Sequence, residues 1–417
     1  MNSRRNFLKI AGVSITGSLL NSVSTKAAKL STNGKTLKVG ILLPQSVEHP
    51  QYPGSFLNGF RLGVDENNAL RKKKIELITE SVNFGTPEIV KEKVQKLLAE
   101  NDVDLITGIL NPEVVSHAGK VFKNAEVPTI IASSGESYLV NELKENPFVF
   151  FNSLNLFQAA YESGKYAVNK FGKRIAVLTS FYDSGYDSLF TFRQGVEAAG
   201  GEIVETFNRG QNDTNFTENT LKRLEELKPD GLYVFMHGTN ADDLIRTIRF
   251  KGIYTPLITT AFSADENRLV HLADAADNIF SISSWDRNSK KEANKTFAEK
   301  YRKSYNKTTD IFSVLGFETG QIVYDSFARC KGDFSGNEIA KALLSCNLQS
   351  PRGEIKINPD SGLVNNKLHI QQCKVSSTGV PKNHVLETMQ PVSEFEKAFA
   401  VLDNDYRSGW LNPYLFV

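Results

Sequence analysis

The most constraining feature of the sequence is a regular alternation of short β-branched runs with helical stretches, which begins at Thr36. Runs typical of buried strands occur at 37–43, 75–82, 103–107 and 129–132. Helical stretches lie between them, at 54–67, after Thr86-Pro87 and at 114–124. Repeated strand–helix units build a parallel sheet that is covered by helices on both faces. The first half of the chain is therefore predicted to be an α/β module.

The alternation restarts in the middle of the chain, which predicts a second α/β module. Its strands are expected at 174–179, 203–207, 231–236, 256–260 and 278–283, and its helices at 155–171, 188–199, 217–227 and 240–251. Three later helical stretches, at 291–305, 313–330 and 335–346, have no strands of their own. Because the first module is the shorter one, we expect the chain to return to it. Residues 352–375 are typical of short strands around a turn at 358–362.

The first 28 residues are predicted to be an export signal. The sequence from Ser3 to Lys9 is Ser-Arg-Arg-Asn-Phe-Leu-Lys, and a weakly apolar run at 10–20 follows it. This pattern resembles a twin-arginine signal, and the run is too short to span a bilayer. The predicted location is the periplasm. The chain has 49 basic and 47 acidic residues, and this balance gives no reason to expect nucleic acid as a partner.

Sequence motifs of catalysis are absent, so we expect a protein that is not an enzyme and carries no cofactor. The chain has no G-x-S-x-G, H-E-x-x-H or P-loop pattern, and no G-x-G-x-x-G follows its first strand. The six histidines show no metal-binding spacing, so we expect no metal. Cys330 and Cys346 lie on consecutive predicted helices. A disulfide bridge and two buried free thiols are both compatible with this spacing.

Polar and aromatic residues gather in the segments that follow the predicted strands. These segments are 44–55, 108–113 and 133–137 in the first module, and 180–186, 237–240 and 260–265 in the second. In parallel α/β sheets, ligands bind beyond the carboxyl ends of the strands. Residues 133–137 could donate hydrogen bonds to a carboxylate or amide, or could form an ordinary capping loop. Tyr52, Phe181, Tyr182 and Tyr186 could close over a small ligand.

These features together resemble the type I periplasmic solute-binding proteins, in particular the leucine/isoleucine/valine-binding branch that serves ABC importers. The resemblance rests on Leu37-Lys-Val-Gly-Ile-Leu-Leu-Pro44, Asn58-Gly59, Asp104-Leu-Ile-Thr-Gly108, Val127-Pro-Thr-Ile-Ile-Ala-Ser133 and the segment 353–362. It implies two Rossmann-like lobes with parallel central sheets, joined by three crossovers near 151–155, 285–288 and 352–358. The expected lobe 1 is 36–152 plus 286–352, and lobe 2 is 153–285 plus 353–380. An extension follows over 381–417.

The resemblance also implies a ligand site between the lobes. Tyr52 would form an aromatic wall of this site. The expected first-lobe contacts to a ligand carboxylate are Asn111, Glu113, Ser133, Ser134, Gly135 and Glu136. The expected second-lobe contacts are Tyr182, Ser184, Tyr186, His237 and Ala261. Ser184 stands where those proteins usually have a tyrosine, and the acid that pairs with an amino-acid ammonium group is missing near Ala261.

The function expected from this resemblance is capture of an amino acid, amide or organic acid by lobe closure, for delivery to an inner-membrane ABC permease. The alternative is a two-lobed sensor that signals to a partner protein. For the sensor, Trp410, Tyr414 and Phe416 could form a docking surface, or they could be a strap across the second lobe. A third hypothesis is an enzyme that is exported with a bound cofactor, which no motif supports.

Overall fold

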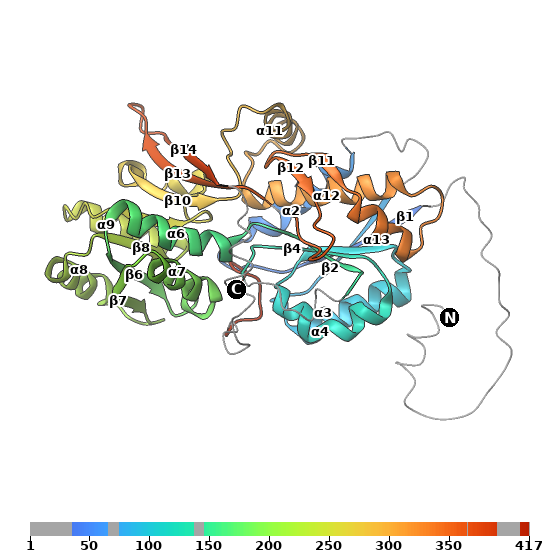
Figure 1. The fold of residues 1–417 in the computed structure, drawn as a ribbon, viewed down its shortest axis with the longest axis horizontal. Coiled ribbons are helices and arrows are strands. Elements are labelled where there is room, and N and C mark those ends of the chain that lie inside the picture. Colours follow the sequence, from blue (N-terminus) through green and yellow to red (C-terminus); the bar gives the residue numbers. More distant parts are fainter. Residues whose placement is uncertain (1–35, 66–74, 137–145, 365, 390–408, 417) are drawn as a thin grey trace, which may run out of the picture.

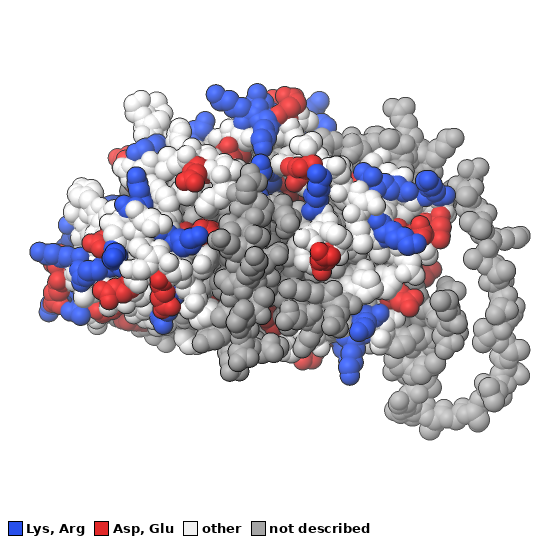
Figure 2. Space-filling model, viewed as in Figure 1, with Lys and Arg blue, Asp and Glu red and all other residues white. Residues whose placement is uncertain are grey.

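The computed structural model describes residues 36–65, 75–136, 146–364, 366–389 and 409–416. The predicted export signal lies outside these residues. The helices among them are all too short or too polar to cross a membrane. Two α/β lobes lie side by side, as the sequence predicts (Figure 1). On the face shown in Figure 2, basic and acidic side chains are interspersed.

The first lobe contains a five-stranded parallel sheet in the order β2-β1-β3-β4-β5. Its strands are β1 (Leu37–Leu43), β2 (Ile75–Ser81), β3 (Leu105–Ile109), β4 (Thr129–Ser133) and β5 (Val149–Ser153). Its helices are α2 (Gln51–Asp65), α3 (Pro87–Lys96), which continues into the π-helical turn η1 (Leu97–Asn101), and α4 (Pro112–Ala125). Leu37, Val39 and Ile41 of β1 belong to one buried cluster and Leu42 belongs to another, so both faces of the sheet are covered.

The second lobe contains a seven-stranded sheet in the order β14-β13-β10-β9-β8-β6-β7. The parallel strands are β6 (Arg174–Ser180), β7 (Glu202–Arg209), β8 (Gly231–Phe235), β9 (Leu257–Thr260) and β10 (Ile279–Ser283). Antiparallel strands β13 (Leu368–Val375) and β14 (Pro381–Met389) extend one edge. The helices are α6 (Leu156–Phe171), α7 (Asp187–Ala198), α8 (Phe216–Leu227), α9 (Gly238–Phe250) and the short α10 (Glu266–Leu269), with 3₁₀ turns η2 (Asp183–Gly185) and η3 (Ala273–Ala276).

The three helices without strands return to the first lobe, as expected from the shortness of the first module. They are α11 (Glu292–Tyr305), α12 (Ile311–Arg329) and α13 (Gly336–Leu344). Helix α12 packs directly against α2 (Figure 1). Glycines allow their backbones to meet: a Cβ atom added to Gly63 would lie 2.1 Å from the carbonyl oxygen of Phe317, and one added to Gly316 would lie 2.0 Å from that of Phe56.

Three strands, at 149–153, 347–349 and 381–389, were not anticipated as such. Strand β5 lies largely in the segment expected to be the first crossover, so the chain crosses just after it, at Leu154 and Asn155. Strand β14 forms the first part of the extension expected over 381–417, and it pairs with β13. The short hairpin of β11 (Asn347–Gln349) and β12 (Glu354–Lys356) precedes the last passage between the lobes. Because Leu363 still bridges to Phe151 of β5, the chain reaches the second sheet only after that point.

The crossovers are tied together by the fully buried side chain of Arg352. Its guanidinium pairs with the buried Glu318 carboxylate of α12. It also donates hydrogen bonds to the Ser153 carbonyl (2.6 Å), to Asn152 Oδ1 (2.7 Å) and to Ser284 Oγ (3.1 Å). Asn152 and Ser153 end β5, and Ser284 follows β10, so this side chain joins the first two connections between the lobes to the β11–β12 hairpin.

Candidate ligand site between the lobes

The carboxyl ends of both parallel sheets face the space between the lobes. In the first lobe, helix α4 begins there because Asn111 caps it, with Asn111 Oδ1 accepting a hydrogen bond from the Glu113 N–H (3.0 Å). Ser134 and Glu136 follow β4 and are fully buried. In the second lobe, Tyr182, Asp183 and Tyr186 follow β6, and His237 follows β8. Residues far apart in the sequence therefore line one interior region.

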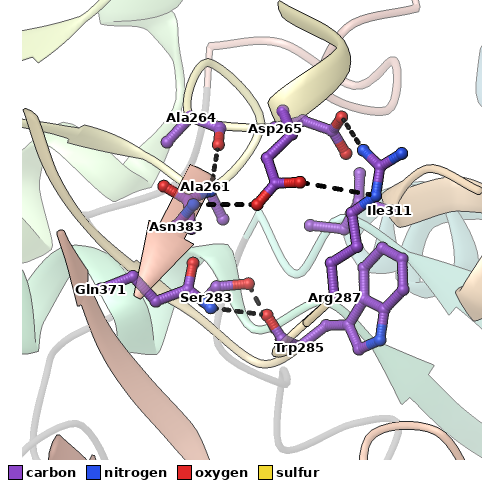
Figure 3. Close-up of a pocket in the computed structure, with 10 residues that line it drawn as sticks. Ala261, Ala264, Asp265, Ser283, Trp285, Arg287, Ile311, Gln371 and Asn383 are labelled. Atoms are coloured by element: carbon purple, nitrogen blue, oxygen red, sulfur yellow. Dashed lines mark hydrogen bonds and ion pairs between the residues drawn. The ribbon is translucent and has the colours of Figure 1, made fainter. Parts of the chain in front are cut away.

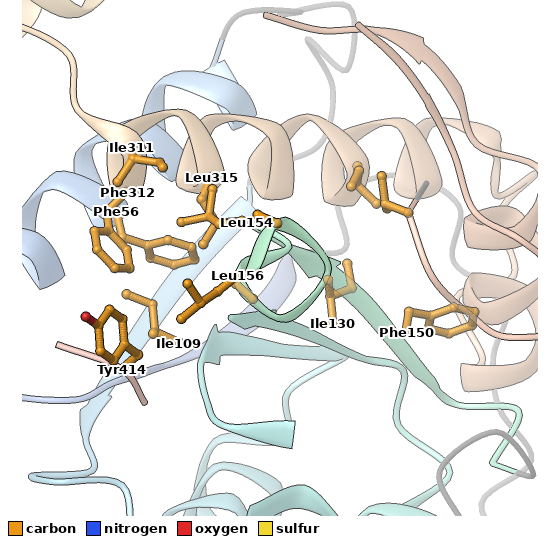
Figure 4. Packing of buried hydrophobic residues seen from close by; sticks show 14 of the residues in the cluster. Phe56, Ile109, Ile130, Phe150, Leu154, Leu156, Ile311, Phe312, Leu315 and Tyr414 are labelled. Carbon is orange, nitrogen blue, oxygen red and sulfur yellow. The ribbon is translucent and has the colours of Figure 1, made fainter. Parts of the chain in front are cut away.

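This region is filled by the chain's own segment Gly409–Phe416, called the tail segment below. Figure 1 shows it between the two lobes. Tyr414, Leu415 and Phe416 are at most 1 % exposed. These residues belong to a buried cluster that also contains side chains from both lobes (Figure 4). Trp410, Tyr414 and Phe416 do not form the exposed docking surface considered for a sensor, because Tyr414 and Phe416 are buried in the cleft.

Polar side chains from the first lobe bind the backbone of the tail segment. Ser46 Oγ donates to the Leu415 carbonyl (2.6 Å), and Ser134 Oγ donates to the Tyr414 carbonyl (3.3 Å). Asn111 Nδ2 donates to the carbonyls of Trp410 (3.4 Å) and Asn412 (3.3 Å). Glu136 Oε1 accepts from the Tyr414 N–H (2.8 Å). The first lobe thus recognises a peptide backbone.

Groups from the second lobe bind the side chains of the tail segment and part of its backbone. The Tyr414 hydroxyl donates to Asp183 Oδ1 (2.9 Å), and Trp410 Nε1 donates to the Tyr182 carbonyl (2.7 Å). The Tyr186 hydroxyl donates to the Asn412 carbonyl (3.2 Å). The tail segment therefore joins the two lobes.

An aromatic cage surrounds the ring of Tyr414. Phe235 lies parallel to it, with ring centroids 5.6 Å apart, and Tyr186, His237 and Phe262 meet it edge-on at 5.1–5.8 Å. Offset-stacked and edge-on contacts are the favourable geometries of aromatic pairs. The cage, together with Asp183, forms a subsite that accommodates a hydroxyphenyl group.

The structure brings most of the predicted site residues to this cleft. Those that contact the tail segment are Asn111, Ser134, Glu136, Tyr182, Tyr186 and His237. Tyr52 is buried one layer away, between His49 and Phe312. Ser133 and Glu113 are buried beside the contacting loops, and Gly135 adopts φ 82° in the turn between Ser134 and Glu136.

Two predicted site residues make their contacts elsewhere. Ser184 Oγ donates to the Phe181 carbonyl (3.1 Å) and accepts from Asn208 Nδ2 (3.0 Å) in exposed surroundings. Ala261 lines a small cavity on the hinge side of the cleft (Figure 3). Four cleft residues are not among the predicted site residues: Ser46, Asp183, Phe235 and Phe262. Ser46 and Asp183 lie in segments marked from the sequence, whereas Phe235 is part of a buried strand and carries no separate signal.

The small cavity in Figure 3 measures about 20 Å³, which is enough for one water molecule. It lies beside the second crossover, where Gln371 Nε2 donates to the Trp285 carbonyl (2.9 Å). The nearby acids are already engaged: Asp265 pairs with Arg287 (3.4 Å), and Glu266 Oε1 accepts from Asn288 Nδ2 (2.6 Å). Asp265 and Glu266 are therefore poorly placed to receive a ligand ammonium group.

Burial controls the charge of the acids at the cleft. Burial raises the pKa of Glu136 to about 7 and, together with the nearby Glu113, raises the pKa of Asp187 to about 8. Glu136 Oε2 and Ser133 Oγ have no hydrogen-bond partner among the described residues. A group that pairs with them would remove an unfavourable feature of the buried site.

His237 forms a charged bridge across the mouth of the cleft. Burial alone would lower its pKa, but Asp183, 2.7 Å from Nδ1, and Glu48, 3.3 Å from Nε2, raise it to about 9. Glu48, His49 and His237 have ligand atoms within 4.8 Å of one another and could hold a divalent cation. As a cation itself, His237 instead pairs the second lobe with Glu48 of the first.

Cys330, Cys346 and Cys373 are buried free thiols, so the described structure contains no Cys330–Cys346 bridge.

Two α/β lobes that enclose a buried site beyond their strand ends define the class of two-lobed solute-binding proteins. The family model described as periplasmic binding protein matches residues 36–379. The chain therefore belongs to the periplasmic binding protein family. Its members are solute-binding proteins and not enzymes, and the family is extracytoplasmic.

Sequence and structure comparisons agree with this assignment. The Leu/Ile/Val-binding protein homolog 6 of Brucella abortus is 21% identical over 368 residues, which covers 85% of this chain and 92% of the relative. An ABC transporter substrate-binding protein from Sphaerobacter thermophilus superposes with a TM-score of 0.76 at 22% identity, covering 86% of this chain and 98% of that one. An ABC transporter solute-binding protein from Rhodopseudomonas palustris BisB5, in complex with 3,4-dihydroxybenzoic acid, has a TM-score of 0.74 at 24% identity, with coverage of 87% and 99%.

Proposed function

We propose that the protein captures a small aromatic acid bearing a hydroxyl group between its lobes and delivers it to an ABC permease. The observation that carries this proposal is the aromatic cage, in which a hydroxyphenyl ring is already held with its hydroxyl on Asp183. The 3,4-dihydroxybenzoic acid bound by the Rhodopseudomonas palustris protein belongs to the same chemical class.

The first-lobe side of the cleft suits the acid group of such a solute. Asn111 and Ser134 are hydrogen-bond donors that face the cleft, and Ser133 Oγ has no partner among the described residues. Glu136 has a pKa of about 7, so it can be protonated and donate to a carboxylate. An aromatic ring with a hydroxyl at one end and a carboxylate at the other would therefore pair with both lobes.

A branched-chain amino acid is the second candidate ligand, favoured by the relative from Brucella abortus. Its ammonium group needs a carboxylate partner. Asp265 and Glu266 are engaged by Arg287 and Asn288. Asp183 already pairs with the His237 cation. The cleft therefore favours the aromatic acid.

Thermal unfolding with a panel of compounds tests this proposal. We expect 4-hydroxybenzoate and 3,4-dihydroxybenzoate, at about 100 times their dissociation constants, to raise the unfolding temperature by about 5 °C. Asp183→Asn should reduce this rise in unfolding temperature. The rise caused by benzoate, which lacks the hydroxyl, should change little with the substitution. Asp274→Asn, at an exposed position of the same lobe, is the control. Stabilisation by leucine and isoleucine alone, or by no compound in the panel, would refute the proposed ligand class.

We further infer that residues 1–28 direct export by the twin-arginine route. Replacing both Arg4 and Arg5 by lysine should leave the unprocessed precursor in the cytoplasm, as seen by cell fractionation. Normal export of the doubly substituted protein would argue against this route.

A further inference from the structure

We propose that the tail segment Gly409–Phe416 is a built-in peptide ligand of the cleft, and that the solute must displace it in order to bind. This inference rests on the proposed function of the cleft as the solute site. It assigns a second ligand to that site: a peptide with a tyrosine that lies in a turn and is followed by apolar residues.

The tail segment is held as a bound peptide is held. Side chains from the first lobe bond to its backbone at Trp410, Asn412, Tyr414 and Leu415. Its tyrosine ring fills the aromatic cage of the second lobe. Backbone hydrogen bonds together with one buried aromatic anchor are the usual elements of peptide recognition.

The tail segment leaves the polar groups of the site incompletely satisfied. Glu136 accepts the Tyr414 N–H through Oε1 only, and its Oε2 and the neighbouring Ser133 Oγ have no partner among the described residues. A permanent core element would be expected to satisfy such buried atoms. A solute that pairs with them gains hydrogen bonds that the tail segment cannot make, and this difference allows exchange.

Competition follows from the overlap of the two ligands. The Tyr414 ring occupies the aromatic cage that the proposed solute needs, and the Tyr414 hydroxyl donates to the Asp183 oxygen that the solute hydroxyl would use. A tethered competitor acts at a high effective concentration. The apparent dissociation constant for the solute is the intrinsic constant divided by the fraction of molecules whose cleft is open. The tail segment would thus set the solute concentration at which the protein loads.

A substitution at Gly185 tests whether the tail segment can be displaced from the cleft. A Cβ atom added at Gly185 would lie 1.8 Å from Trp410 Nε1, and its three nearest atoms would all belong to that indole. The Gly409 N–H also donates to the Gly185 carbonyl (2.9 Å). Gly185→Ala should therefore expel Trp410. Gly54→Ala is a matched control, because a Cβ added there meets nothing within 4 Å.

The first experiment measures exposure of Trp410 in the full chain. The only other tryptophan, Trp285, is 4% exposed, so a new acrylamide-accessible fluorescence signal reports on Trp410. We expect Gly185→Ala to increase quenching and to shift emission to longer wavelength, and Gly54→Ala to change neither. Apparent solute affinity should rise about tenfold in Gly185→Ala. Unchanged quenching in Gly185→Ala would overturn the inference.

The second experiment uses a blocked synthetic peptide with the sequence of residues 409–416. The full chain carrying both Trp410→Ala and Tyr414→Ala should bind this peptide in calorimetric titration, whereas the unsubstituted chain, whose cleft is filled, should bind it at least about tenfold more weakly. If this variant does not fold, Gly185→Ala and its fluorescence still decide the question.

The two experiments separate this inference from the proposed function. Peptide binding to the double variant without competition by any aromatic acid would support the built-in ligand and refute the solute class. Equal solute affinity in the unsubstituted and Gly185→Ala chains, with no peptide binding to the double variant, would refute the built-in ligand and leave the solute-binding function standing.

Discussion

Glu136 shows how the fold sets the chemistry of one residue. It follows β4 at the carboxyl edge of the first sheet, where it is fully buried and accepts the Tyr414 N–H. Burial raises its pKa to about 7 from an ordinary value of 4.5. The residue therefore changes charge near neutral pH, at the point where the acid group of the proposed solute would bind.

This pKa makes the stability of the protein depend on pH in a specific direction. The folded state holds the Glu136 proton more tightly than the unfolded state does. Its stabilising contribution is therefore present below about pH 4.5 and is lost as pH rises through about 7. Glu136→Gln removes this dependence. The unsubstituted protein should lose about 3 kcal/mol of stability between pH 4.5 and pH 8 that Glu136→Gln does not lose. The free energy of unfolding of Glu136→Gln minus that of the unsubstituted protein should therefore rise by this amount.

Urea denaturation at both pH values measures this change. Glu202→Gln, at an exposed position, is the control. A stability difference between Glu136→Gln and the unsubstituted protein that stays constant with pH would show that Glu136 is ionised as an ordinary carboxylate.

At the scale of elements, the pair α2–α12 builds the first-lobe wall of the cleft. Gly59 and Gly63 on α2, and Gly316 and Gly320 on α12, lie four residues apart on each helix, and each faces a backbone carbonyl of the other helix. This close approach places Phe312, at the start of α12, against Tyr52 of α2 and Phe416 of the tail segment. Packing of the two helices therefore determines the position of the cleft wall.

Replacing one of these glycines should separate the helices. In Gly63→Ala the new methyl group would lie 2.1 Å from the Phe317 carbonyl oxygen, so we expect a loss of about 1–3 kcal/mol of stability. Gly54→Ala, on the exposed side of the same helix, should be neutral or stabilising by up to about 1 kcal/mol, because alanine favours helix. Thermal unfolding compares the two variants. Equal stability of Gly63→Ala and Gly54→Ala would contradict this packing.

The elements with strong apolar runs could be predicted from the sequence, whereas others could not. Strands β1 and β6 are buried and β-branched, and their predicted bounds agree with the structure to within a residue. Strand β14 is mostly exposed at the sheet edge, so it has no apolar pattern to detect. The site residues that follow strands were likewise predictable, but the cage formed by Phe235 and Phe262 depends on packing between distant segments.

At the scale of the whole molecule, the two lobes meet through the crossovers and through the cleft. Arg352 joins the crossovers, and His237 with Glu48 joins the lobes across the cleft mouth. The tail segment could be recognised from the sequence as unusually aromatic, but its place could not: Tyr414 bonds to Asp183, 231 residues earlier in the chain. No local sequence pattern predicts such a contact. The contact holds the tail segment in the cleft.

A crystal structure of the full chain grown with 4-hydroxybenzoate would show whether the solute replaces the tail segment in the cleft. We expect the compound's ring to lie against Phe235 and between Tyr186 and Phe262, with its hydroxyl bonded to Asp183 and Tyr414 outside the cage. The Tyr414 ring still on Asp183, with no compound between the lobes, would contradict this expectation.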